Sequence, residues 1–215
     1  MSMILHGYFR SSAAYRVRIA LNLKGLAYEQ VSVHLRRGEQ RDSEFMKLQP
    51  QALVPALVDG DATLIQSPAI LEYLDEAYPD TQPLLPQGPV DRARVRGLAA
   101  AVCCDIHPLD NLRVLQYIQG PLGHDQETMI TWFNHWITLG FEALEALLAQ
   151  DPRTGEFCHG EAPGLADVCL IPQIVNSERH NLDLAPYPTI QRIGEACSRL
   201  NAFQQAHPSA QPDAE

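Results

Sequence analysis

Residues 8–18 read Tyr8-Phe9-Arg10-Ser11-Ser12-Ala13-Ala14-Tyr15-Arg16-Val17-Arg18 and decide how the first part of the chain folds. The apolar run 3–5 before them predicts a strand, and the two serines predict a helix over 12–24, because a serine hydroxyl accepts from the N–H groups that open a helix. The positive end of the helix dipole at this corner favours an anion. A hydroxyl there can also donate to a thiolate and stabilise its charged form. Without further motifs, a pair of serines is more often a plain helix cap.

A second helix start lies at Gln66-Ser67-Pro68, after the apolar run 62–65. Ser67 as the N-cap with Pro68 in the first helical position is a strong start signal. Upstream, Val54-Pro55 opens a short apolar strand, a place where proline is tolerated and where the peptide bond can be cis. The sequence therefore predicts two helix N-termini and a proline turn in the first third of the chain.

Together these motifs resemble the zeta class of glutathione transferases, and the resemblance covers nearly the whole chain. The residues Ser11-Ser12-Ala13 and Arg16-Val17-Arg18 are similar to the zeta pattern Ser-Ser-Cys-x-x-Arg-Val-Arg, with Ala13 at the cysteine position. The resemblance implies an α/β thioredoxin-like domain over 1–82 and an all-α domain over 88–215, which is the glutathione transferase fold. It also implies glutathione as the cofactor and a homodimer as the assembly.

The spacing of apolar residues and the positions of glycine and proline predict the secondary structure of both parts. In the first part we expect strands at 3–8, 28–33, 56–58 and 63–65, and helices at 12–24, 43–48 and 68–78. A linker follows, with four prolines between residues 79 and 89. The second part predicts helices at 90–118, 126–150, 165–178 and 189–202, the first of them kinked at His107-Pro108. Asp167 is expected to cap the helix that begins near residue 165.

Composition limits the classes of function. The chain of 215 residues carries a formal net charge of −10, which argues against nucleic acid and anionic membranes as partners. Its apolar runs are shorter than the ~18 residues of a membrane-spanning helix, and its N-terminus does not resemble a signal peptide. The five cysteines are expected to be reduced, and their spacing does not predict a metal site. We therefore expect a cytoplasmic protein that acts on a small molecule.

The resemblance also implies a glutathione site. In the family, a hydroxyl at the position of Ser11 activates the thiol, the Val-Pro peptide binds the cysteinyl part, and the (Glu/Gln)-Ser pair binds the γ-glutamyl carboxylate. Tyr8 is expected to pack nearby and leave that activating role to Ser11. The segment 105–111 resembles the Asp-Ile-His-Pro-x-x-Asn segment of the family's isomerases, and His107 and Asn111 should share a helix face. The expected ligands of glutathione are Ser11, Ser12, Gln51, Val54, Pro55, Gln66, Ser67, Asp105, His107 and Asn111.

The implied activity is isomerisation of a cis maleyl-keto acid to its trans form by reversible addition of the glutathione thiolate. Ser11 and Arg10 are the expected catalytic residues, and Arg10, Arg113 and Arg179 are expected to bind the two carboxylates of the substrate. This arginine set slightly favours maleylpyruvate over maleylacetoacetate. Each of three residues also has a structural alternative. Arg113 can form an ion pair at the domain interface, and Arg179 can cap the C-terminus of a helix. His107, which precedes a proline, can simply hydrogen-bond to the backbone at the kink.

Two other functions remain open. One is a zeta-type transferase that attacks α-halo acids with the same thiolate. The other is a non-catalytic binding or scaffold protein with the glutathione transferase fold. Ala13 in place of the family's cysteine argues against reactions that need a disulfide between protein and glutathione.

Overall fold

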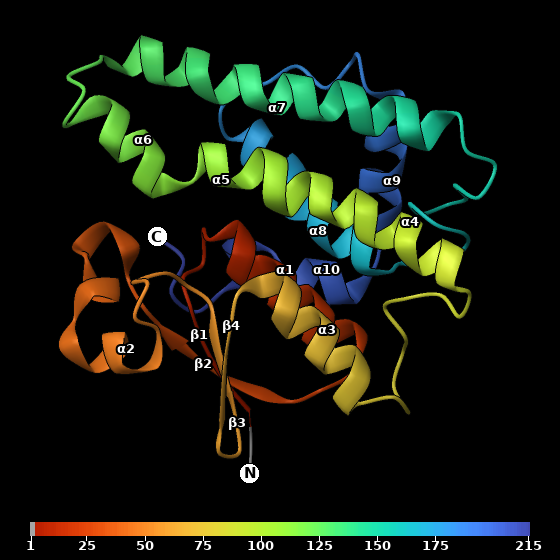
Figure 1. The fold of residues 1–215 in the computed structure, drawn as a ribbon, viewed down its shortest axis with the longest axis horizontal. Coiled ribbons are helices and arrows are strands. Elements are labelled where there is room, and N and C mark those ends of the chain that lie inside the picture. The colour runs from red at the N-terminus through yellow and green to blue at the C-terminus, as the bar shows by residue number, and fades with distance from the viewer. Residues whose placement is uncertain (1–2) are drawn as a thin grey trace. The chain divides into compact units, whose positions relative to one another are not determined.

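The computed structural model describes residues 3–215, which form two compact units (Figure 1). Unit 1 contains the described residues up to Leu84 together with residues 198–215, and unit 2 contains residues 85–197. The resemblance implies a helical domain over 88–215, which would include residues 198–215. They pack with the first part of the chain instead, because Arg18 Nε donates to the Ala206 carbonyl at 2.9 Å and Asn22 donates to the Ala202 carbonyl at 3.0 Å. Within the described residues, none of the helices is both long enough and apolar enough to span a membrane.

A four-stranded mixed sheet forms the centre of unit 1, in the order β2-β1-β3-β4. Strand β1 pairs in parallel with β2 and antiparallel with β3, so that Leu5 lies opposite Gln30 on one side and Leu57 on the other. Buried and half-buried residues alternate along β1, because successive side chains of a strand point to opposite faces of the sheet. The strands are β1 (Met3–Gly7), β2 (Tyr28–Ser32), β3 (Ala56–Asp59) and β4 (Ala62–Ile65).

The helices of unit 1 confirm the predicted order and the thioredoxin-like fold. Helix α1 packs against α3 and α10, and it is buried on every side from Ser12 to Leu21. The basic loop near residues 36–41 forms two short 3₁₀ turns, η1 (Leu35–Arg37) and η2 (Glu39–Arg41). The α-helices are α1 (Ser12–Leu23), α2 (Ser43–Leu48), α3 (Ser67–Ala77) and α10 (Asn201–Ala206), followed by the 3₁₀ turn η4 (Pro208–Ala210).

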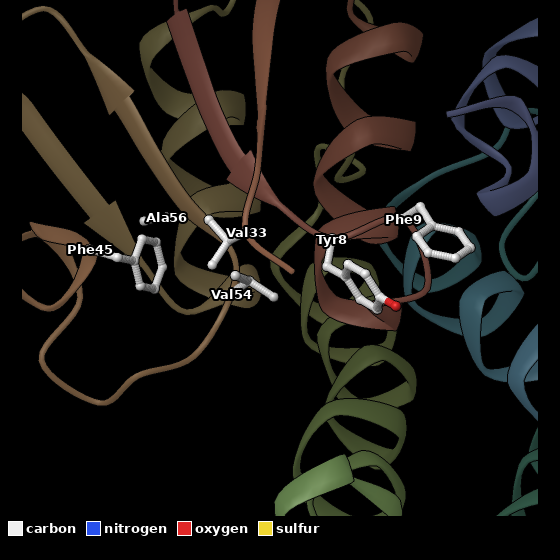
Figure 2. Close-up of a cluster of buried hydrophobic side chains, with 6 residues drawn as sticks. All are labelled: Tyr8, Phe9, Val33, Phe45, Val54 and Ala56. Carbon is white, nitrogen blue, oxygen red and sulfur yellow. The ribbon is translucent and has the colours of Figure 1, made fainter. Parts of the chain in front are cut away.

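A small apolar cluster lies beside the end of β1 (Figure 2). It joins side chains from the β1–α1 corner, from the end of β2, from α2 and from the approach to β3. Its members are Tyr8, Phe9, Val33, Phe45, Val54 and Ala56. The cluster packs the β1–α1 corner against the turn that contains Val54. The segments before Ser11 and around Val54-Pro55 therefore share the same apolar contacts.

Unit 2 is built from helices, and its first helical stretch is more broken than the sequence predicted. We expected one kinked helix over 90–118, which is wrong. Residues 101–106 form a π-helical segment, and Asn111 adopts an extended backbone (φ −65°, ψ 143°) that ends one helix and begins another. The elements are α4 (Pro89–Ala100), η3 (Ala101–Ile106), α5 (His107–Asp110), α6 (Leu112–Gln119), α7 (Gln126–Ala149), α8 (Leu165–Glu178) and α9 (Pro188–Ser198).

Helix α7 supports this broken stretch and runs alongside η3, α5 and α6 (Figure 1). Trp132 Nε1 donates to the Leu109 carbonyl at 2.8 Å. Gly140 lets α7 approach η3 closely, because a Cβ at that position would lie 2.3 Å from the Ile106 side chain. π-Helical segments concentrate at functional sites, which draws attention to the residues that η3 and α5 carry.

Asp167 confirms the expected helix cap. Its carboxylate is buried and accepts the backbone N–H groups of Cys158 at 2.8 Å and Gly164 at 2.9 Å. It therefore satisfies a donor at the start of α8 and ties the preceding loop to it.

Candidate active site

Ser11 caps the N-terminus of α1. Its backbone is extended (φ −68°, ψ 115°), and its Oγ accepts the backbone N–H of Ala14 at 3.2 Å. Because the oxygen accepts in this contact, the hydroxyl hydrogen can be donated to an anion in front of the helix. The helix begins at this serine pair, as expected, with Ser11 as the cap and Ser12 as the first, buried helical residue.

The backbone before Ser11 is held by two side chains, those of Arg18 and Asp213. The Arg18 guanidinium donates to the carbonyl of Phe9 at 3.0 Å and to that of Tyr8 at 3.5 Å. From the C-terminal segment, Asp213 Oδ2 accepts the Phe9 N–H at 3.1 Å. Burial lowers the pKa of Arg18 to about 10, so its side chain is still charged at neutral pH. Both backbone polar groups of Phe9, its N–H and its carbonyl, are therefore hydrogen-bonded, which fixes the turn before Ser11.

Two side chains flank this corner. Arg10 is half-buried, and its guanidinium carbon lies 5.0 Å from the centre of the Phe9 ring. The Tyr8 ring is buried and packs 4.8 Å from the Phe9 ring. Burial raises the pKa of Tyr8 above its usual value, so the phenol is neutral around pH 7. Tyr8 thus packs beside this corner, and Ser11 stays the expected activating group.

The second candidate corner contains the turn at Val54 and the start of α3. The Val54–Pro55 peptide bond is cis, and Val54 belongs to the apolar cluster of Figure 2. The expected N-cap at Ser67 is one residue off: Gln66 is the N-cap and Ser67 opens the helix. Gln66 Nε2 donates to Gln51 Oε1 at 2.7 Å, which brings two of the expected ligands together.

The backbone of Gln66 is unusual, with φ 66° and ψ 112°. A residue other than glycine in this region costs on the order of 1–3 kcal/mol, and such residues cluster at ligand sites. Gln66 makes no side-chain cap to α3. The first donors of α3 and the positive end of its dipole therefore suit an anionic group.

The remaining candidates belong to unit 2. Asp105 is exposed on η3, and His107 begins α5. The prediction that His107 and Asn111 share a helix face is wrong, because the chain leaves the helix at Asn111. Asn111 instead caps α6, where its Oδ1 accepts the backbone N–H of Arg113 at 3.1 Å, and Arg113 itself is exposed.

Asp110 is the centre of a polar network in unit 2. Its side chain is fully buried, and Oδ2 accepts from Gln173 Nε2 at 2.6 Å and from Asn176 Nδ2 at 3.3 Å. Asn176 Oδ1 in turn accepts from Arg179 Nη2 at 2.5 Å. Arg179 is the C-cap residue of α8, the position that the capping alternative predicted, while its side chain reaches back to Asn176. The network holds a guanidinium at the end of α8 in a defined orientation.

Comparison with known proteins identifies the family. The family model "Glutathione S-transferase, N-terminal domain" matches residues 1–76. A probable maleylacetoacetate isomerase of Vibrio cholerae is 51% identical over 216 residues, which cover 100% of this chain and 99% of that protein. The solved holo structure of a maleylpyruvate isomerase, described as a bacterial zeta-class glutathione S-transferase, is 48% identical, with a TM-score of 0.96 over 99% of this chain and 100% of that one. This chain belongs to the zeta class of glutathione transferases.

A second solved structure extends the comparison. It is a maleylacetoacetate isomerase from Methylobacterium extorquens with bound malonate and glutathione, and it is 45% identical. Its TM-score is 0.96, over 99% of this zeta-class chain and 99% of that chain. The expected family and fold are thereby confirmed.

Two polar residues of this zeta-class chain were not among the predicted site residues. Arg16 belongs to the Arg16-Val17-Arg18 motif and is fully buried, where it contacts Ser67. Asp110 lies within the segment 105–111, in which only Asp105, His107 and Asn111 have an expected role. The mostly apolar residues 13–21 could have indicated that Arg16 is buried, because they leave little of α1 to face water. The position of Asp110, three residues after His107, could have indicated that the two side chains lie close together.

Proposed function

We propose that this chain is a glutathione-dependent cis–trans isomerase of a maleyl-keto acid. The observation that carries the proposal is the Ser11 hydroxyl, which caps α1 through its oxygen and keeps its hydrogen for an anion. A relative with the same fold binds both glutathione and malonate, a small dicarboxylate. The Ser11 hydroxyl suits the thiol of glutathione, and the malonate bound by the relative suggests a substrate with two carboxylates.

The residues of unit 1 fit glutathione. The start of α3 lacks a side-chain cap and suits the γ-glutamyl carboxylate, with Ser67, Gln66 and Gln51 as its ligands. Val54 and Pro55, at the cis peptide bond, are proposed to bind the cysteinyl part through their backbone. When bound, glutathione supplies a thiolate that adds reversibly to the conjugated double bond of the substrate.

Ser11 has the central catalytic role in this proposal. Its hydroxyl donates to the sulfur and lowers the thiol pKa, because a hydrogen bond to the charged form favours that form. The dipole of α1 acts in the same direction. Ser12 lies beside it as the first residue of the helix, and Arg18 with Asp213 keeps the turn in place. Since Ala13 replaces the family's cysteine, the protein itself offers no thiol at this corner.

Arginines are the proposed ligands of the substrate carboxylates. Arg10 follows Phe9 directly and precedes Ser11, so it can pair with a carboxylate and stabilise negative charge near the reacting atoms. Arg179, oriented by Asn176, and Arg113 are the proposed partners in unit 2. Asp105, His107 and Asn111 stay proposed ligands of glutathione, with Asn111 also serving as a helix cap. Of the two substrates, the arginine set favours maleylpyruvate.

An absorbance assay with maleylpyruvate and with maleylacetoacetate tests the function. We expect one or both to be converted to the trans isomer only when glutathione is present. Ser11→Ala should lower kcat by about 10²-fold or more and change glutathione affinity little, whereas Ser11→Thr should keep activity because it keeps the hydroxyl. Turnover of α-halo acids without isomerisation would favour the transferase alternative. Failure to bind immobilised glutathione would favour the scaffold.

We also propose that the enzyme is a cytoplasmic homodimer. The free state of its five cysteines supports a reducing compartment. The zeta-class family supports the dimer. Light scattering tests the assembly, where a mass near twice 23.9 kDa is expected and a monomer mass would contradict it.

A further inference from the structure

Arg16 is a buried cation with incomplete partners. It lies on α1 with 1% of its surface exposed. Its Nη1 donates to Ser67 Oγ at 3.3 Å, while Nε and Nη2 are buried and lack a hydrogen-bond partner within residues 3–215. A buried guanidinium with two unsatisfied nitrogens is strongly unfavourable unless an anion joins it.

Two other buried cations, Arg18 on α1 and Lys24 at its C-cap, have complete sets of protein partners for comparison. Lys24 donates to Asp75 at 3.1 Å and to the Gln82 carbonyl at 3.0 Å. Arg18 donates to the backbone carbonyls of Tyr8, Phe9 and Ala206. Arg16 alone among these three lacks both a carboxylate and a carbonyl partner in the described chain. Its counter-charge is therefore expected to come from a bound molecule.

The place where that molecule would bind is the start of α3. Ser67 opens this helix of 11 residues, whose N-cap makes no side-chain hydrogen bond. Gln66 holds its unusual positive φ directly before Ser67. Helix donors, a buried serine and a buried cation behind it thus converge on one point, and each of the three favours an anion.

We propose that Arg16 is a positioning residue for the anionic end of glutathione. By donating to Ser67 Oγ, Arg16 makes that oxygen an acceptor and turns the hydroxyl hydrogen outward to the γ-glutamyl carboxylate. Its charge also compensates the carboxylate across a short, poorly solvated distance. The inference rests on the proposed binding of glutathione, and it adds a residue behind the ligands that the family motif names.

The test measures binding of two thiol-blocked peptides by calorimetry, so that it does not depend on the isomerase chemistry. One peptide is S-methylglutathione, and the other carries 4-aminobutanoyl in place of γ-glutamyl and so lacks the carboxylate. Arg16→Met is compared with wild type, and Arg16→Lys keeps the charge. Lys24→Met is the matched control, because it removes a buried cation at the C-cap of the same helix, and this cation already has a protein partner.

We expect Arg16→Met to weaken S-methylglutathione by about 10- to 100-fold and to leave the peptide without the carboxylate nearly unchanged. Arg16→Lys should recover part of the loss. The thermal midpoint of unliganded Arg16→Met should be equal to or above that of wild type, since an unpaired buried charge is gone. Lys24→Met should lower the midpoint, because Asp75 loses its cation and keeps only the N–H of Leu84, and should keep the preference for the carboxylate.

Equal weakening of both peptides by Arg16→Met, or unchanged binding of S-methylglutathione, would overturn the inference. Failure of wild type to bind S-methylglutathione would overturn it together with the proposed cofactor. A wild type that binds this peptide and discriminates through Arg16, yet does not isomerise maleyl-keto acids with glutathione, would support the inference and reject the proposed reaction. The two failures are therefore distinguishable.

Discussion

The carboxylate of Asp213 accepts the backbone N–H of Phe9 at 3.1 Å, although 204 residues separate them in the chain. The same Oδ2 accepts from the Ser32 hydroxyl at 2.9 Å, and Oδ1 accepts from Gln30 Nε2 at 3.2 Å. Phe9 stands two positions before Ser11. The C-terminal segment is thus part of the support of the proposed catalytic corner.

Asp213→Ala tests that support. It leaves the partly buried Phe9 N–H without its acceptor, which should cost about 1–3 kcal/mol of unfolding free energy and lower kcat more than it raises KM for glutathione. Chemical denaturation and steady-state kinetics measure the two effects. Ser32→Ala is the control, because it removes one exposed contact of Asp213 and keeps the bond to Phe9; an equal effect of both variants would contradict the account.

The pH dependence separates Ser11 from Tyr8. Activity should rise with pH through the pKa of the bound thiol, since only the thiolate reacts. Ser11→Ala removes a donor to the thiolate, so the rising limb of kcat/KM should move to higher pH by about 1 to 2 units. Because the proposal assigns this hydrogen bond to Ser11, Tyr8→Phe should leave the limb where it is. A displaced limb in Tyr8→Phe would make Tyr8 the activating group.

Asn176→Ala tests the network that orients Arg179. The variant removes the acceptor of Arg179 Nη2 and a donor to buried Asp110. We expect KM for the dicarboxylate to rise about 5- to 20-fold while affinity for glutathione stays the same, because the guanidinium loses its fixed orientation. Arg179→Ala should have a similar effect, and the double variant should be little worse than either. Additive losses would show that Asn176 does not act through Arg179.

Gly140→Ala tests the contact between α7 and the π-helical segment. The new Cβ would lie 2.3 Å from Ile106, so we expect a loss of about 1–3 kcal/mol of unfolding free energy. Gly97→Ala is the matched control within a helix, since it meets nothing within 4 Å and should stabilise α4 by about 0.5–1 kcal/mol. Ile106→Ala should relieve the clash in Gly140→Ala. Equal stability of the two glycine variants would contradict the close approach.

Much of unit 1 could be predicted because its signals are local. Serine before an apolar helical pattern, Asp59-Gly60 between two short strands, and proline at a strand start each fix one element through the physics of neighbouring residues. The start of α1 at the two serines followed from such a signal and is confirmed. The N-cap was placed one residue too late, at Ser67, because Gln66 adopts a positive φ that is uncommon for glutamine and is not predicted by its residue type.

The broken stretch of unit 2 was not predictable from local pattern. Residues 101–106 carry no proline or glycine, and the π-helical turn depends on Ile106 packing where α7 has Gly140, 34 positions away. His107-Pro108 predicted a kink, but the extended backbone at Asn111 placed the break three residues later. The same limit applies to Arg16 and Asp213, whose partners lie 51 and 204 residues away.

The central claim is that glutathione enters the reaction and returns unchanged at the Ser11 corner. The most direct measurement supplies limiting glutathione and counts trans product formed per thiol, alongside the free thiol left at the end. The account predicts many product molecules per glutathione with all thiol recovered, and a loss of this turnover in Ser11→Ala. Consumption of one thiol per substrate molecule, or isomerisation at the same rate without glutathione, would contradict it.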